Sequence, residues 1–201
     1  MSIVKLNNRS VKDITSFGSI SSLGSLTHIA TQTASSSASL SFTSGIDSTY
    51  KEYIFYFIDM HPASDSVNFT FNMSIDSGSN YNVTKTTTFF DGRVSESGSD
   101  AGIAYSSSRD LAQSTDFQML ARELGNDNDQ ATSGFLHLFN PSSSVFVKHF
   151  ISKLNSAYSG NYTMQHYVAG YGNTTSAVDA VQFKMSSGNI DSGQILLFGL
   201  N

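Results

Sequence analysis

The chain has 201 residues with a net charge of −5, and it contains no Cys and no Trp. These values exclude a disulfide scaffold, a thiolate metal site and a cysteine nucleophile. They also argue against nucleic-acid binding, which needs clustered Lys and Arg. No window approaches the ~18 apolar residues of a membrane span, so we expect no membrane insertion. The first 20 residues lack the apolar run of a signal peptide, so we expect a soluble protein synthesised in a cytoplasm.

Small hydroxyl side chains dominate the composition. The sequence has 37 Ser and 16 Thr, which together occupy 53 of 201 positions. With 15 Phe and 9 Tyr, however, the chain has too many aromatic residues for a disordered protein. The length predicts one folded domain, or one domain with an arm.

Residues 1–25 differ from the rest of the chain because their apolar residues follow no regular spacing. We expect an extended N-terminal arm that buries these side chains on another surface and thereby anchors a domain formed by residues 26–201. The candidate anchoring residues are Val4, Leu6, Val11, Ile14 and Phe17.

Alternating apolar and polar residues then predict a series of strands, because strand side chains point to opposite faces with period two. The clearest case is residues 67–75, in which five apolar and four polar residues alternate. Further strands are predicted at residues 39–43, 50–60, 81–90, 135–139, 145–151, 162–169, 180–185 and 195–200. Turn residues lie between them, so the sequence predicts an all-β, antiparallel, jelly-roll-like β-sandwich.

Three further segments show patterns other than a plain strand alternation. Residues 117–124 have a spacing that fits either a helix or a strand. Residues 95–108 are polar and predict a long loop. The pair Asp91 and Gly92 is typical of a hairpin turn.

The sequence shows no pattern of residues that is typical of a catalytic site. His137, His149 and His166 lie in predicted strands, where hydrogen-bonded sheet residues are the usual case. No nucleophile elbow and no phosphate-binding glycine loop occurs. Residues 125–130 are rich in oxygen ligands without the spacing of an EF-hand, which leaves a solvated turn or a looser calcium site open. We therefore expect a non-enzymatic protein without catalytic residues, a metal or a cofactor.

A cluster of tyrosines is the strongest candidate for binding. Tyr158, Tyr162, Tyr167 and Tyr171 occur within fourteen residues and are interrupted by glycines. A tyrosine ring offers a flat apolar face and a hydroxyl, which suit stacking on a sugar or contact with a protein partner. The alternative is ordinary packing of these rings on the sheet.

Several segments resemble one family of virion structural proteins from tailed phages that infect marine bacteria. The segments are TQTASSSA at 31–38, SGIDSTYKEY at 44–53, HPASD at 61–65, NPSS at 140–143, FVKHF at 146–150, GYGNTTSA at 170–177, FKMSSGNIDSG at 183–193 and LFGL at 197–200. The start, VKLNNR at 4–9, is similar to that of phage fibre and appendage proteins.

The resemblance implies a tail-fibre-like or head-decoration-like protein that is located on the virion. It implies a homotrimer that contacts other proteins of the tail or capsid, and it supplies no catalytic residues. A carbohydrate-binding module that recognises host surface glycans is the alternative function, and host glycans are then a further candidate partner.

Overall fold

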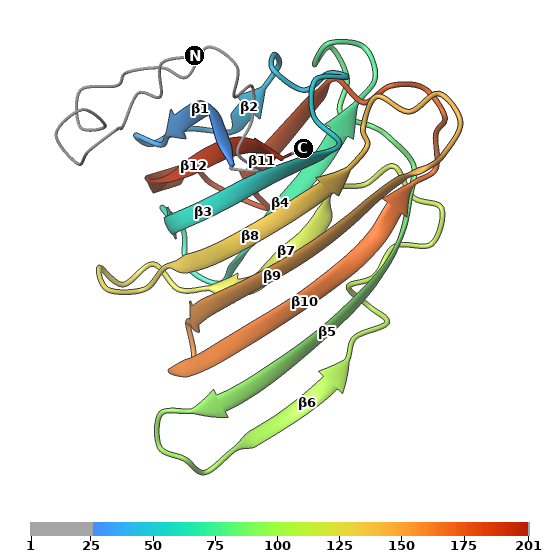
Figure 1. The fold of residues 1–201 in the computed structure, drawn as a ribbon. Coiled ribbons are helices and arrows are strands. Elements are labelled where there is room, and N and C mark those ends of the chain that lie inside the picture. The colour runs from blue at the N-terminus through green and yellow to red at the C-terminus, as the bar shows by residue number, and fades with distance from the viewer. Residues whose placement is uncertain (1–25, 201) are drawn as a thin grey trace, which may run out of the picture.

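The structure is a computed structural model that describes residues 26–200. Residues 26–200 contain twelve strands and no helix, and Figure 1 shows how the strands are arranged. The strands are β1 (Thr27–Thr33), β2 (Leu40–Phe42), β3 (Glu52–Pro62), β4 (Val67–Ser74), β5 (Lys85–Ser95), β6 (Ala101–Tyr105), β7 (Gln118–Leu124), β8 (Thr132–Phe139), β9 (Lys148–Tyr158), β10 (Tyr162–Gly172), β11 (Ala180–Met185) and β12 (Ile190–Leu200).

All strand pairs are antiparallel, and they form two layers of unequal width. A broad layer runs in the order β1-β12-β3-β8-β9-β10-β5-β6, and a narrow layer runs β7-β4-β11-β2. The layers are joined where Leu124 of β7 pairs with Tyr158 of β9. At the far end the Gln32 side chain of β1 donates to the Ser41 carbonyl of β2 at 3.4 Å. The sheet is therefore nearly closed into a barrel, and the predicted all-β antiparallel architecture is confirmed.

The alternation that predicted the strands also sorts side chains between the two faces of the broad layer. In β9, Phe150, Ser152 and Leu154 are buried, whereas Ile151 and Lys153 are exposed. The face that turns toward the narrow layer is called the inner face here, and the opposite one the outer face.

The core between the layers is built from phenylalanine rings. Phe183 of β11 lies at its centre, and its ring centroid is 5.1 Å from that of Phe57 and 5.2 Å from that of Phe55, both in β3. It also stacks on Phe69 and Phe71 of β4 at 5.9 and 6.2 Å. All five rings are at most 2% exposed. The rings of one layer thus interlock with those of the other.

The segment at 117–124, whose spacing fits either a helix or a strand, contains the strand β7, because Leu120 and Leu124 are buried while the segment pairs with β4. Other local expectations need correction. The expected loop at 95–108 contains β6, which pairs with β5. Asp91 and Gly92 lie in the middle of β5 rather than in a turn, because the chain reverses at residues 96–100 instead. Strand β1 was not predicted. The candidate anchoring residues in 1–25 lie outside the described range.

Replacing the central ring tests this view of the core. We expect Phe183→Ala to lower the free energy of unfolding by about 3–5 kcal/mol, because the cavity removes contacts to five neighbouring rings, those of Phe42, Phe55, Phe57, Phe69 and Phe71. Urea denaturation measures this loss. Phe146→Ala is the matched control, because Phe146 is 67% exposed and its removal should change stability by no more than about 0.5 kcal/mol. Equal effects of the two variants would contradict the proposed role of Phe183.

Candidate functional site

The structure divides the four candidate tyrosines into two pairs. Tyr158 and Tyr162 face each other across the β9–β10 turn, with ring centroids 5.7 Å apart. The Arg122 guanidinium lies 5.4 Å from the Tyr158 ring centroid. Tyr167 and Tyr171 lie four residues apart on the outer face of β10. The predicted cluster is therefore not a single patch.

Tyr171 borders an apolar hollow on the outer face, with a volume of 490 Å³. The hollow is lined by Ala169 and Gly170 of β10 and by His149 and Ile151 of β9, among others. A Cβ atom on Gly170 would lie 2.5 Å from the Thr86 carbonyl oxygen, so this position has no room for a side chain. Small residues and aromatic rings line this hollow together. Such a surface suits the flat face of a sugar or an apolar side chain.

A second apolar surface lies on the outer face of β5 and β6, where these strands extend beyond the narrow layer (Figure 1). Ile103 is 84% exposed and Tyr105 is 58% exposed, and both belong to β6. Phe90 and Val94 of β5 are exposed on the same face, since Phe90 pairs with Tyr105 and Val94 with Ala101. We call these four residues the β5–β6 patch. Contiguous exposed apolar residues are typical of an interaction site.

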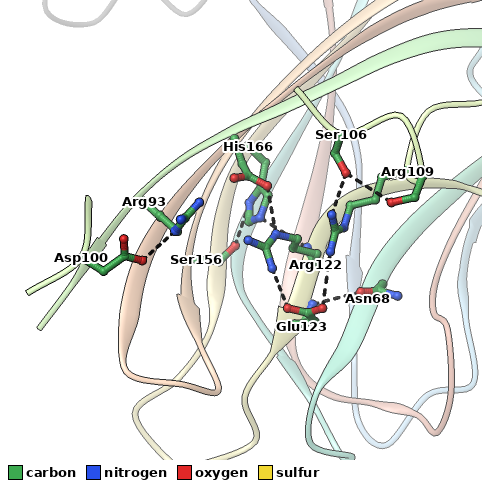
Figure 2. Close-up of polar contacts among 11 residues, drawn as sticks. Asn68, Arg93, Asp100, Ser106, Arg109, Arg122, Glu123, Ser156 and His166 are labelled. Atoms are coloured by element: carbon green, nitrogen blue, oxygen red, sulfur yellow. Dashed lines mark hydrogen bonds and ion pairs between the residues drawn. The ribbon is translucent and has the colours of Figure 1, made fainter. Parts of the chain in front are cut away.

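An ionic network occupies the inner face where β7 borders the broad layer (Figure 2). Arg122 contacts Asp91 of β5 at 2.9 Å and Glu123 at 2.6 Å. Arg109 contacts the other carboxylate oxygen of Glu123 at 3.5 Å. The hydrogen bond to Glu123 raises the pKa of the Tyr158 hydroxyl. Both carboxylates are thus held by arginine, and the network ties β5, β7 and β9 together.

His166 of β10 completes this network. Its side chain is fully buried, its Nε2 accepts from the Arg122 backbone N–H at 3.4 Å, and its Nδ1 lies 3.4 Å from the Ser156 hydroxyl. Burial lowers the pKa of His166 to about 4. The ring is therefore neutral near pH 7. Its two nitrogens link β10 to the Arg122 backbone in β7 and to the Ser156 hydroxyl in β9. This agrees with the expectation of a hydrogen-bonded sheet residue.

The segment at residues 125–130 borders a polar hollow together with Asp59, His61 and Asp191. Across residues 26–200, no group of three or more histidine or acidic side chains has a geometry that could hold a metal ion.

Sequence reasoning missed two buried lysines, Lys85 and Lys148. The Lys148 Nζ donates to three backbone carbonyls, those of Ser143, Phe146 and Thr174. The Lys85 Nζ donates to the Val83 carbonyl and to the Asn72 side chain. One signal was available for Lys148, because it lies two residues before Phe150 and so shares the inward-facing register of β9.

Comparison with protein-family models, with curated proteins and with solved structures gave no match for this chain. In the part of the chain that the structure describes, no helix has the length and apolar character needed to cross a membrane.

The burial of His166 predicts a specific pH dependence. Its pKa is lower in the folded chain, at about 4, than the ordinary 6.5. Between these values only the unfolded state binds the proton, so the stability due to neutral His166 is complete above about pH 6.5 and is lost toward pH 4. The loss should reach about 3 kcal/mol.

Urea denaturation of the wild type and of His166→Gln across this pH range checks the expectation. The charges of Asp91, Glu123, Arg109 and Arg122 act on His166, and the variant keeps all four residues. Glutamine keeps a donor and an acceptor but does not titrate, so the variant should lose less stability as the pH falls. Parallel stability curves for the two proteins would rule out His166 as the titrating group.

Proposed function

We propose that the protein is a non-enzymatic structural component of a tailed-phage virion, a displayed β-sandwich that assembles with neighbouring protein subunits. The resemblance of its segments to virion structural proteins supports the virion location. The β5–β6 patch supports assembly, and it is the observation on which the proposal depends most. Residues 1–25 are proposed as the arm that anchors the domain to other virion proteins, in either the tail or the head.

The β5–β6 patch has three properties of a protein interface. Its apolar side chains are exposed together on one face. Within residues 26–200, strand β6 pairs only with β5, so its other edge presents backbone groups that have no strand partner in this range. The five residues of β6 carry no charge, whereas protected edge strands commonly carry charged residues or proline. Addition of a partner strand at this edge would pair the backbone and cover Ile103 at the same time.

A charged substitution in β6 tests this assembly surface. We expect the full-length wild type to form an oligomer, a trimer in this proposal, and Ile103→Lys to shift it toward the monomer, because a lysine there opposes burial of the patch. Size-exclusion chromatography with light scattering measures the mass in solution. Val145→Lys is the matched control, because Val145 is 68% exposed in a loop outside the patch.

The control should keep the wild-type mass. A monomeric wild type, or equal masses for the wild type and Ile103→Lys, would contradict self-assembly through β6. Failure to detect the protein in purified phage particles by mass spectrometry would contradict the virion location.

The outer hollow favours a second candidate function, recognition of host surface glycans. Its mainly apolar lining, which includes Tyr171, matches the kind of surface on which sugar rings stack. We expect the wild type to bind at least one glycan on an array and Tyr171→Ala to lose that signal. Tyr162→Ala is the matched control, because Tyr162 lies outside the hollow. Absence of any wild-type signal would remove this candidate.

A further inference from the structure

Two fully buried polar side chains from different layers meet at one end of the sandwich. Asn72 belongs to β4 of the narrow layer, and Lys85 is the first residue of β5 in the broad layer. Both side chains are completely inaccessible to solvent. The Lys85 Nζ lies 2.6 Å from the Asn72 Oδ1. An amine and a carboxamide are thus enclosed in direct contact.

The carboxamide of Asn72 is held in one orientation. Its Oδ1 accepts from the Met73 backbone N–H at 2.8 Å as well as from Lys85. Its Nδ2 donates to the Tyr81 and Thr115 carbonyls at 2.7 and 2.9 Å. During attack on the carbon by Lys85, the Met73 N–H would remain as a donor to this oxygen and would stabilise the negative charge that develops there.

The amine of Lys85 is prepared as a nucleophile. Burial lowers its pKa to about 7, against the opposing effect of the Asp116 charge. A large fraction of the amine is therefore unprotonated near neutral pH, and only the unprotonated form has the lone pair needed for attack. The Val83 carbonyl, 2.7 Å from Nζ, fixes the position of the amine.

We propose that Lys85 and Asn72 form an intramolecular isopeptide bond. The Nζ lone pair attacks the Asn72 Cγ and forms the new C–N bond, and the oxygen of the tetrahedral carbon is held by the Met73 N–H. One Nζ proton passes to Nδ2, the Cγ–Nδ2 bond breaks, and ammonia leaves. An amide and an amine become an amide and ammonia, so the step needs no oxidant, reductant or other co-reactant.

Such a bond would fasten the narrow layer to the broad layer by a covalent link. It would close a segment of chain between β4 and β5, which restricts the unfolded state as a disulfide does. Lys148 provides the internal comparison. Its Nζ contacts backbone carbonyl oxygens and no side-chain carboxamide, so the same reaction is not expected there.

Mass spectrometry of the purified full-length chain tests the proposal. The intact wild type should weigh less than its sequence mass by one ammonia, about 17 Da. Trypsin cannot cleave after an acylated lysine, so residues 52–93 should appear as one peptide that carries the mass loss. Unmodified protein would instead be cut after Lys85 into peptides 52–85 and 86–93.

Three variants complete the test. Lys85→Arg and Asn72→Ala should both show the full sequence mass and a lower melting temperature than the wild type. Lys148→Met is the control, and it should keep the loss of one ammonia. Full mass with cleavage after Lys85 in folded wild type would overturn the proposal. The same mass loss with cleavage after Lys85 would also overturn it, because the ammonia would then have left another residue. The wild-type peptide map decides the question even if a variant does not fold.

Discussion

The structure depends on the packing of aromatic rings between two layers of unequal width. Burial of apolar rings is the dominant favourable contribution to folding, and here it is concentrated around Phe183, which contacts rings from both layers. The narrow layer covers only part of the broad one. Two features lie where the narrow layer ends. One is the ionic network at β7, and the other is the extension of β5 and β6 that the narrow layer does not cover.

The border of β7 explains why charged groups are found beside a phenylalanine core. Arg122 is only 13% exposed, and it is paired with both Asp91 and Glu123. Removing one partner would leave a poorly solvated charge, so the members of such a network depend on one another. His166 stays neutral in the same environment. The network thus fixes how β5, β7 and β10 lie together.

The sequence predicted the fold class and most strands, because burial on one face leaves a period of two in strands such as β4 and β9. Strand β6 was not predicted, because the strand is exposed on both faces. Its residues therefore show no alternation of buried apolar and exposed polar side chains. The candidate site was harder to predict. Tyr158 and Tyr171 are close in sequence, but the length of β10 and the opposite faces of the strand separate them. Contacts such as Arg122 with Asp91 join distant strands and leave no local pattern.

The pairing of β1 with β12 has a mechanical consequence. Thr27 lies opposite Gly199, so both ends of the described chain leave the sheet at the same corner. A load applied between residues 26 and 200 would therefore open the β1–β12 ladder from this corner, one hydrogen bond after another. Unzipping of this kind needs less force than sliding two strands past each other, because the bonds do not share the load. Strand β1 would separate from β12 first. The phenylalanine core between the layers would come under tension only after β1 had separated.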